Sequence, residues 1–496
     1  MKKNLPAMTL GSSWLYGLLV AAGYLAVALI HWRHSWAPLS QGYVFSDLGA
    51  SSESNPLLEV GQTISLCWLY SLYLLALINW QRRGFSVREI IAIGVLPGLL
   101  AFGALPANST DILSYTGQGR MVAIHGANPY LHTYSEFADS FSPFVEWDIT
   151  MPYGPVMLSV FIVAGWVSAY SVLGAIFTLK LIWLATHVAN CFLIYRILQS
   201  WRSNPAFVPA FGLFLYGLNP LALLELVANG HNDGLLIFFC LSAFYALQRQ
   251  WHGVALWLAL LSALVKLPGV LILSSVAVYL MWRREWRGLK LGSLGCAASL
   301  LFVKVTLFPT IESLLSLANT GSHTHNSLHH LLIGAVHELS MRLELAIDRE
   351  TVYLANRRLF SALLIGFSLW RWLGLRSLSG LTRELAYIFS ALLIGQAAWF
   401  FPWYVVWLLP LAALTDSARL RWAIIVFSWT ALALYAFPDF IVTEAPLREL
   451  WAALRIGVAH IPPLILLARA FRGDAGHDRG ELKEATSGGD LMKTML

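Results

Sequence analysis

Apolar stretches long enough to cross a lipid bilayer recur along almost the whole chain. A helix needs about 20 apolar residues to span the hydrocarbon core, with roughly 17 to 25 tolerated. Counting such stretches predicts about 14 transmembrane helices. They lie near residues 14–30, 59–79, 89–106, 172–197, 206–228, 233–248, 253–266, 268–282, 289–307, 359–373, 384–400, 402–415, 421–437 and 450–470. The pattern therefore predicts an all-α polytopic membrane protein.

Short basic loops between these stretches predict how the chain is oriented. Lys and Arg are enriched in cytoplasmic loops, and basic residues cluster at 82–88, 196–202, 283–290, 371–383 and 419–421. All five clusters face the cytoplasm only if the apolar stretch Val156–Ser168 does not cross the membrane but lies in the interface or dips in and returns. Both termini are then expected to be cytoplasmic, and the segments 31–58, 107–170 and 308–358 extracytoplasmic.

We expect one integral membrane domain over residues 1–470, followed by a polar, disordered cytoplasmic tail at 471–496. Within the domain, residues 1–106 form N-terminal helices and residues 107–170 form a long outer loop containing interfacial helices. Residues 171–470 form a helical core, which includes the outer loop 308–358.

Composition supports a membrane location and excludes several classes of function. Hydrophobic residues make up 57% of the chain and charged residues 12%, outside the usual range of soluble domains. The net charge of +6 is scattered between apolar stretches, so we expect it to orient the chain in an inner (plasma) membrane and not to bind nucleic acid. The four cysteines lie inside apolar stretches and predict neither a disulfide framework nor a zinc site.

The densest polar segment is 108–120, directly after the third apolar stretch. Helical spacing puts Asp111 and Tyr115 on one face, and Gly119 permits close approach. Asp111 is thus a candidate general base at the boundary of water and lipid. The alternative is that Asp111 caps a juxtamembrane helix.

A second polar segment, 229–234, joins two apolar stretches by a very short connection. Its residues His231 and Asp233 could bind a phosphate, orient a sugar hydroxyl or form a second acid–base pair. The alternative is a tight turn, for which Asn, Gly and Asp are suited, although a turn does not require His. The role of nearby Glu225 stays open.

Three lysines fall in the predicted outer half of the membrane, against the usual bias. They are Lys180, Lys266 and Lys304. An anionic lipid phosphate at the outer leaflet would compensate these charges, and Lys266, at a break between two short helices, is the strongest candidate. Snorkelling of the lysine side chains is the alternative, favoured for Lys304.

Two further segments are candidates for substrate contact. Four histidines lie between residues 321 and 330, but no Cys or carboxylate accompanies them at a familiar ligand spacing, so we expect a substrate-covering loop and no metal site. The aromatic cluster 399–404, which includes Trp403 and Tyr404, could stack on a sugar or a prenyl chain, or form an interfacial belt.

An ordered series of motifs between residues 105 and 410 resembles the bacterial polyprenol-phosphate-mannose-dependent mannosyltransferases of the GT-C superfamily. The motifs are Asp111–Tyr115 with Gly119-Arg120, Gly126–Tyr130, Pro152–Pro155, Asn219-Pro220 through Asp233, Val265–Pro268 and Phe401–Tyr404. The resemblance implies a GT-C architecture, a lipid-linked sugar donor and an acidic catalytic base in an outer loop. In many such enzymes the catalytic acid follows the first helix, so Asp47 is a rival to Asp111.

The residues and the resemblance together give the expected site. Its catalytic candidates are Asp111, His231 and Asp233. Its substrate-binding candidates are Tyr115, Arg120, Asn128, Tyr130, Tyr153, Asn232, Lys266, Trp403 and Tyr404. No metal and no other cofactor is expected.

We therefore expect an integral membrane glycosyltransferase that moves a hexose, with mannose favoured, from a polyprenyl phosphate to a glycan or glycolipid acceptor outside the cytoplasm. A single base and a good leaving group predict inversion at the anomeric carbon. The alternatives are a transporter or flippase of lipid-linked saccharides, and a ligase or polymerase of surface polysaccharide. A transporter would be expected to carry charged residues along a central path, whereas the polar groups here gather on one side.

Overall fold

The computed structural model describes residues 13–48, 55–82, 84–146, 148–201, 203, 204, 206–308, 310, 313, 324–345, 347–375, 377–436 and 445–488. Within these residues the regular elements are helices, apart from one isolated β-bridge between His325 and Trp399.

The first half of the chain forms the following elements. They are α1 (Ser13–Gln41), α2 (Pro56–Ile78), α3 (Val87–Gly103), α4 (Asp111–Ala123), the 3-10 turns η1 (Tyr134–Glu136) and η2 (Ser142–Phe144), α5 (Pro155–Ser168), α6 (Val172–Trp201), α7 (Pro209–Gly217), α8 (Pro220–Ala222), the π-helical turn η3 (Leu223–Ala228) and α9 (Asp233–Gln248).

The second half continues the same pattern. Its elements are α10 (His252–Ala263), α11 (Gly269–Trp282), α12 (Trp286–Leu307), α14 (Leu328–Arg342), α15 (Arg349–Trp372), α16 (Leu378–Ala391) with the π-helical turn η5 (Leu392–Gln396), the 3-10 helix η6 (Pro402–Trp407) with α17 (Leu408–Leu414), α18 (Ala418–Thr430), α19 (Ala433–Ala436) and α20 (Ala445–Gly488).

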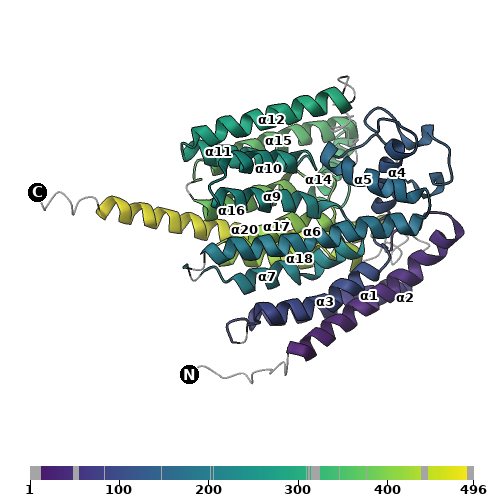
Figure 1. The fold of residues 1–496 in the computed structure, drawn as a ribbon, viewed down its shortest axis with the longest axis horizontal. Helices are drawn as coiled ribbons and strands as arrows, with labels where there is room; N and C mark the ends of the chain where they lie inside the picture. The colour runs from purple at the N-terminus through teal and green to yellow at the C-terminus, as the bar shows by residue number, and fades with distance from the viewer. Residues whose placement is uncertain are drawn as a thin grey trace, which may run out of the picture.

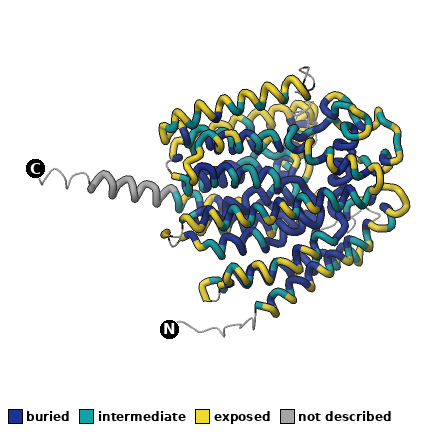
Figure 2. The backbone as a smooth tube through the Cα atoms, in the orientation of Figure 1, coloured by how far each residue is buried: buried dark blue, intermediate teal, exposed yellow. Residues whose placement is uncertain are grey.

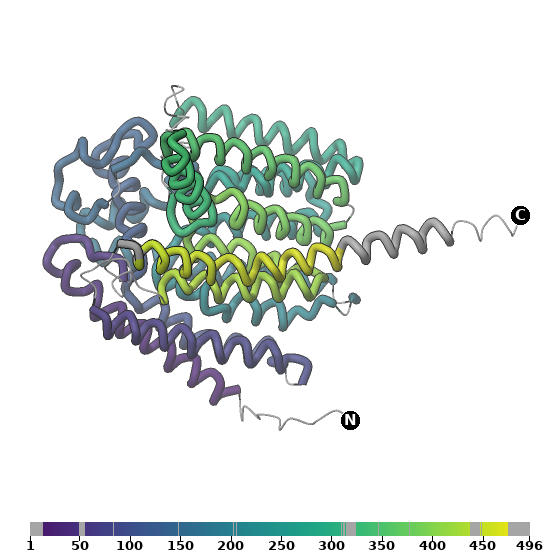
Figure 3. The backbone as a smooth tube through the Cα atoms, turned by 180° about the vertical axis from the view of Figure 1, so that it is seen from behind, coloured from purple at the N-terminus to yellow at the C-terminus, as the bar shows by residue number. Residues whose placement is uncertain are grey.

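The long helices lie side by side in one bundle, and α4 and α5 occupy one end of it (Figure 1). Helix α14 lies across this same end, whereas the start of α1 and the end of α20 lie at the opposite end (Figures 1 and 3). Helices at the centre are buried and those at the periphery are exposed (Figure 2). Peripheral α12 exposes large apolar side chains, including Leu294, Phe302 and Val305, as expected for a surface that faces lipid.

Each of the fourteen apolar stretches overlaps a described helix or helix pair. Six of the described helices are long and apolar enough to cross a membrane by themselves. They are α1, α2, α6, α12, α16 together with η5, and Glu449–Asp474 of α20. A seventh span arises if α7 and the segment Pro220–Ala228, bent by 47° at their junction, are counted together. The polytopic membrane class is therefore confirmed, and the count of about fourteen crossings stays a prediction.

The C-terminal segment begins as a continuation of the last helix. Helix α20 continues to Gly488, and Asp474 accepts hydrogen bonds from the Tyr387 hydroxyl at 2.8 Å and the Ser417 hydroxyl at 3.0 Å. The polar composition after residue 471 disfavours burial, but extending a helix that is already formed requires no new nucleation. The disordered cytoplasmic tail at 471–496 stays a prediction.

Helix α1 is attached to the segment that leads into α4. The His31 imidazole contacts the carbonyl oxygen of Leu105 at 2.8 Å, and its other ring nitrogen contacts Gln62 of α2 at 3.0 Å. Trp32 donates to the carbonyl of Gly103 at 2.7 Å, and the Ser35 hydroxyl donates to the carbonyl of Pro106 at 2.6 Å. These contacts satisfy carbonyls that the end of α3 leaves unpaired.

Helices α4 and α5 cross with their backbones in contact. A β-carbon on Gly119 would lie 1.8 Å from the carbonyl oxygen of Phe161, and one on Gly165 would lie 2.4 Å from the carbonyl carbon of Gly119. Small residues permit such close approach between membrane helices. The close approach predicted at Gly119 is therefore present, and it fixes α4 against α5.

Candidate active site

Asp111 is the first residue of α4, and its carboxylate faces Tyr115 one turn later. The Tyr115 hydroxyl donates a hydrogen bond to Oδ2 of Asp111 at 3.0 Å. The N-cap position belongs to Thr110, so Asp111 does not cap the helix as the alternative reading of the sequence supposed. The Asp111 side chain is 11% exposed, so it is shielded from water without being sealed.

His231 lies between two carboxylates that come from distant parts of the chain. Its Nδ1 is 3.4 Å from Oδ2 of Asp111, and its Nε2 is 3.3 Å from Oε2 of Glu225. The ring is fully buried and stacks on Trp403 with the ring centroids 3.8 Å apart. Burial by itself would lower the pKa of His231, but the two carboxylates outweigh it and raise this pKa to about 9. His231 is therefore an imidazolium at neutral pH.

The turn that carries His231 is built around the π-helical segment η3. The His231 N–H donates to the carbonyl of Glu225 at 2.9 Å, so Glu225 holds both the backbone and the ring of His231. Gly230 has φ +80°, and a β-carbon there would lie 2.5 Å from Cδ1 of Ile112 in α4. Asn229 donates to Glu225 at 3.1 Å and accepts from the N–H of Asn108 at 3.4 Å. The turn is thereby fixed against the start of α4.

Asp233 and Lys266 form a separate buried ion pair. Lys266 Nζ donates to Oδ1 of Asp233 at 2.8 Å, and the indole N–H of Trp407 donates to the same oxygen at 2.7 Å. The ammonium lies over three aromatic rings, at 5.4 Å from the centroid of Tyr153, 4.9 Å from that of Tyr404 and 5.4 Å from that of Trp407. Such cation–π contacts stabilise a positive charge that is removed from water.

These contacts differ from one alternative that the sequence offered. An acid–base pair was one of three possible roles for His231 and Asp233, but His231 pairs with Asp111 and Glu225 while Asp233 pairs with Lys266 and Trp407. The spacing of these two residues in the sequence did not reveal that their side chains point in different directions. His231 lies in the turn before α9, whereas Asp233 is the first residue of that helix.

Tyr153 connects the two ion-pair systems of the site, which are Asp111–His231–Glu225 and Asp233–Lys266. Its ring packs edge-on against Tyr115 at 5.6 Å, its hydroxyl is hydrogen-bonded with that of Tyr115, and Lys266 lies over its ring. The backbone around Tyr153 is held by Gly154 N–H donating to the carbonyl of Val265 at 3.0 Å. Asp111 and Lys266 are therefore the anionic and cationic groups of one site, linked through Tyr115 and Tyr153.

Asn232 lies between the two systems in sequence and is fully buried. Neither its amide nitrogen nor its amide oxygen makes a hydrogen bond to the part of the chain that the structure describes. A buried amide without partners costs about 1–3 kcal/mol and calls for an explanation, such as a bound ligand.

Three candidate substrate-binding residues instead hold the outer loop together. Arg120 pairs with Asp139 at 2.7 Å and donates to the Ser168 hydroxyl at 3.1 Å. Asn128 donates to the carbonyl of Leu307 at 2.8 Å, and the Tyr130 hydroxyl donates to the carbonyl of Tyr153 at 2.9 Å. These residues act on the site through the loop that carries Tyr153.

Lys180 corrects an expectation from the sequence. It was a candidate for binding lipid phosphate, but it is fully buried, and its ammonium donates to the carbonyls of Ala101, Ala104 and Ala228. These carbonyls lie at the ends of α3 and η3, whose last acceptors lack partners within their own helices. Lys304 donates to the carbonyl of Phe308, four residues later.

Asp47 lies close enough to Asp111 to interact with it electrostatically, although it precedes α2. Burial raises the pKa of Asp47 well above its usual value, and the nearby carboxylates of Asp111 and Glu146 raise it further. Glu146 accepts a hydrogen bond from the Thr110 hydroxyl. Sequence reasoning missed Glu146 and Trp407, although Trp407 lies four residues after Trp403, a spacing that can place two side chains on one helical face.

The histidine-rich segment is only partly described, since His323 lies outside the described residues. His325 contacts the rings of Trp399 and Phe401 at 5.6 and 5.5 Å, and Nε2 of His329 is 2.5 Å from the carbonyl oxygen of Gly395. Among the described residues, no group of three or more His, Cys, Asp or Glu side chains is placed to hold a metal ion.

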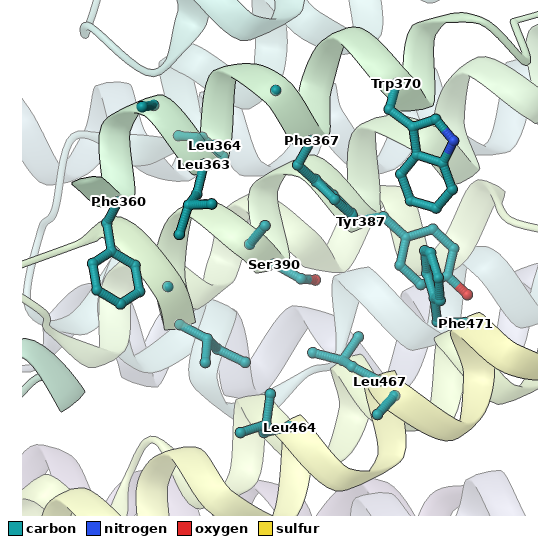
Figure 4. Close-up of a pocket in the computed structure, with 16 residues that line it drawn as sticks. Phe360, Leu363, Leu364, Phe367, Trp370, Tyr387, Ser390, Leu464, Leu467 and Phe471 are labelled. Atoms are coloured by element: carbon teal, nitrogen blue, oxygen red, sulfur yellow. The ribbon is translucent and has the colours of Figure 1, made fainter. Parts of the chain in front are cut away.

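A separate cavity of about 690 Å³ lies between α15, α16, η5 and α20. Figure 4 shows aromatic and aliphatic side chains around it, among them Phe367, Trp370, Leu467 and Phe471. Its lining includes none of the charged residues described above. The charged residues around Asp111 and Lys266 therefore lie outside this cavity.

Comparison with known proteins agrees with this picture. Residues 15–282 match the model of a family described as alpha-(1->6)-mannopyranosyltransferase, N-terminal domain. The chain is also 26% identical over 488 residues to alpha-(1->6)-mannopyranosyltransferase A of Mycobacterium tuberculosis, with 84% of this chain and 89% of that protein covered. The mannosyltransferase resemblance carried by the sequence motifs is thus confirmed. The chain belongs to the alpha-(1->6)-mannopyranosyltransferase family and is a membrane mannosyltransferase.

Proposed function

We propose that the protein transfers mannose from a polyprenyl-phosphate donor to a mannose-containing glycan or glycolipid, forms an α-(1→6) linkage, and inverts the anomeric carbon. The single observation that carries the proposal is that two charged groups are linked through Tyr115 and Tyr153. They are the shielded carboxylate of Asp111 and the ammonium of Lys266, which lies over aromatic rings. An inverting transfer to an alcohol with a phosphate leaving group needs these two groups: a base and a cation.

Asp111 is the proposed base. In the reaction the acceptor hydroxyl oxygen bonds to C1 of the donor mannose, its proton passes to a carboxylate oxygen of Asp111, and the bond from C1 to the phosphate oxygen breaks. The electron pair of that bond leaves with the polyprenyl phosphate, so a single displacement inverts C1. Formation of an α-linkage by inversion requires a donor whose phosphate is β-linked.

Asp47 is a weaker candidate for the base. Burial and the neighbouring carboxylates hold the pKa of Asp47 well above its usual range, which favours the protonated form of this carboxyl. A protonated carboxyl cannot accept the acceptor's proton. In this scheme Asp47 is a neutral neighbour that can donate a hydrogen bond.

Lys266 is the proposed phosphate-binding cation. An ammonium has three N–H donors, and one of them serves Asp233. The others can reach a phosphate oxygen, and the aromatic surroundings exclude water, which strengthens the attraction as negative charge develops on the leaving group. Asn232 is positioned by sequence next to both ion-pair systems, and its unpartnered amide can bind a sugar hydroxyl, while Trp403 and Tyr404 offer ring faces to the sugar.

We place the reaction on the extracytoplasmic side of the plasma membrane, with both termini in the cytoplasm. Helices α4 and α5 lie at the end of the bundle opposite the start of α1 and the end of α20 (Figure 1), and basic loops favour the cytoplasm. A cysteine introduced at Ala127, beside the turn that follows α4, should react with a membrane-impermeant maleimide added outside intact cells. Reaction only after permeabilisation would contradict this orientation.

The function itself is tested by a transfer assay with purified full-length protein in detergent or liposomes. The donor is polyprenyl-phosphate mannose, radiolabelled in the sugar and supplied separately as the β- and α-linked anomers, and the acceptor is a short α-mannoside. We expect product from the β-linked donor, with an α-(1→6) linkage by NMR. No transfer from either anomer, or transfer of labelled lipid across liposomes without product, would overturn the proposal.

A further inference from the structure

Glu225 is a buried carboxylate that the proposed reaction does not use, and it lies at the end of a row of three ionisable side chains. The row runs from Asp111 through His231 to Glu225, with contacts of 3.4 and 3.3 Å. Glu225 and His231 are both fully buried, whereas Asp111 keeps partial access to solvent. A buried carboxylate is expensive unless it is paired, so Glu225 requires an explanation of its own.

We infer that Glu225 is a positioning residue: it holds His231 against Asp111, and the imidazolium orients the Asp111 carboxylate for proton abstraction. The inference rests on the proposed role of Asp111 as the base. Glu225 itself touches neither donor nor acceptor in this scheme and acts only through His231.

The geometry favours a fixed cation over a proton relay. Glu225 contacts the His231 ring with its side chain and accepts the His231 N–H with its backbone carbonyl, so that ring and turn are held by one residue. Stacking on Trp403 restricts the ring further. A relay would require His231 to accept the proton from Asp111, but an imidazole already protonated between two carboxylates has no free site for it.

The π-helical turn explains how Glu225 reaches this position. Residues 223–228 make the wider π turn, a feature often found at functional sites. The turn closes with Asn229 N–H donating to the carbonyl of Leu224 at 2.8 Å. Asn229 then donates its side-chain amide to the same Glu225 oxygen that faces His231, at 3.1 Å, which orients the carboxylate.

Other titratable groups lie around this row of three side chains. Asp47, from the segment after α1, interacts electrostatically with both Asp111 and His231. Tyr115 donates to Asp111, and Tyr435 of α19 lies beside Glu225. None of these groups supplies a positive charge, and the nearby Lys180 ammonium is directed to backbone carbonyls, so the imidazolium is the cation that contacts both carboxylates.

The pH dependence has a definite sign. The raised pKa of His231 means that its charge is present below this pKa and is lost as the pH rises through about 9. Loss of the cation leaves Asp111 beside other acidic groups without compensation, and activity falls. Removing the charge of Glu225 lowers the pKa of His231, so the alkaline limb of the kcat profile moves to lower pH.

The test measures kcat and KM between pH 5 and 10 for wild type, Glu225→Gln, His231→Gln and the double variant, with polyprenyl-phosphate mannose and an α-mannoside. We expect the alkaline limb of the Glu225→Gln profile to move to lower pH by about one unit. At pH values above the limb, kcat should therefore be about tenfold lower than that of wild type. We expect KM for the donor to stay within about twofold, because Glu225 makes no substrate contact. Glu225→Asp keeps the charge and should retain most of the wild-type profile.

Three results would overturn the inference. One is an unmoved alkaline limb in a Glu225→Gln protein that melts like wild type. Another is persistence of the same limb in His231→Gln, which can be scored even if Glu225→Gln fails to fold. The third is a further limb shift when Glu225→Gln is added to His231→Gln. If wild type transfers mannose and Asp111→Asn does not, these results reject the role of Glu225 alone; a wild type without transfer rejects the proposed function.

Discussion

Lys266 donates a 2.8 Å hydrogen bond to Asp233, whose side chain is fully buried, while the lysine keeps a 12% exposed surface. Replacing Lys266 by Met would leave an uncompensated buried carboxylate, which costs about 3–5 kcal/mol. We therefore expect Lys266→Met to lower the melting temperature of the protein in detergent and to abolish transfer.

A double variant separates these two effects. Lys266→Met with Asp233→Asn removes both charges, so its melting temperature should return toward that of wild type. Transfer should stay absent, because no cation remains for the phosphate. Recovery of both stability and transfer in the double variant would show that Lys266 serves only Asp233.

Asp111→Asn removes the proposed base and changes the volume of the side chain very little. A general base contributes about 10²–10⁴-fold to a rate, so we expect kcat to fall by at least two orders of magnitude with KM for the donor little changed. Asp47→Asn is the matched control, since burial and the neighbouring carboxylates raise the pKa of Asp47 and disfavour its charged form, and it should retain transfer within about tenfold. The reverse order of the two activities would make Asp47 the base.

Gly119 meets Gly165 and Phe161 with no room for a β-carbon. Gly119→Val should push α4 away from α5 and shift Asp111 relative to Lys266, so that both melting temperature and kcat fall. Gly98 in α3 has no atom within 4 Å of an added β-carbon, and Gly98→Ala should be neutral or stabilise by about 0.5–1 kcal/mol. Equal behaviour of the two variants would contradict the close crossing of α4 and α5.

Asp139 holds the outer loop through Arg120, His125 and Tyr134. Burial tends to raise the pKa of Asp139, but hydrogen bonds from Arg120 and its other partners outweigh this effect and lower the pKa to about 2. The stabilising contribution is therefore complete above the unfolded pKa of about 3.9 and is lost as the pH falls through about 2. Pepsin should cleave residues 124–150 of wild type increasingly between pH 4 and pH 2.

The neutral variant supplies the comparison for this loop. Asp139→Asn should already be cleaved at pH 4, whereas Glu338→Gln, at an exposed ion pair with Arg342, should follow wild type. A loop in Asp139→Asn that resists pepsin as wild type does would show that the Arg120 pair does not hold it.

Lys180 satisfies carbonyls at the ends of two helices that lead into the site. Lys180→Met keeps an unbranched side chain but leaves these acceptors unpaired, so we expect a lower melting temperature and lower kcat together. The control is Lys304→Met, which removes a bond to a carbonyl only four residues away and should change both quantities little. A Lys180→Met protein that melts like wild type would mean that water can replace the ammonium.

The sequence predicted the helices well, because a bilayer sets their length and apolar character directly. It also predicted contact between Asp111 and Tyr115, since helical spacing is local and needs no tertiary information. The sequence did not predict contacts between segments that are distant along the chain. Nothing in the pattern around Lys180 indicates that its charge is met by carbonyls of Ala101, Ala104 and Ala228, so a lipid phosphate was the natural expectation.

The partners of His231 illustrate the same limit. Its neighbour in sequence, Asp233, was the obvious candidate, yet Asp111 lies 120 positions earlier and Glu225 points back only because a π turn replaces an α turn. Periodicity cannot forecast a one-residue change in helical winding, because the same apolar residues suit both forms. The contacts that Arg120, Asn128 and Tyr130 make within the protein could not be predicted for a related reason, since their partners also lie in distant segments, and their role in substrate binding stays a prediction.

The bonds from His31, Trp32 and Ser35 to carbonyls just before Asp111 make the first helix part of the reaction centre's support. Helices at the beginning of a membrane enzyme are often regarded as anchors that can be exchanged or removed. Here, removing α1 would leave three carbonyl acceptors without these partners in the segment that leads to Asp111, and would remove the helix to which the Asp47 segment is joined. A minimal version of this enzyme therefore cannot be made by trimming from that side.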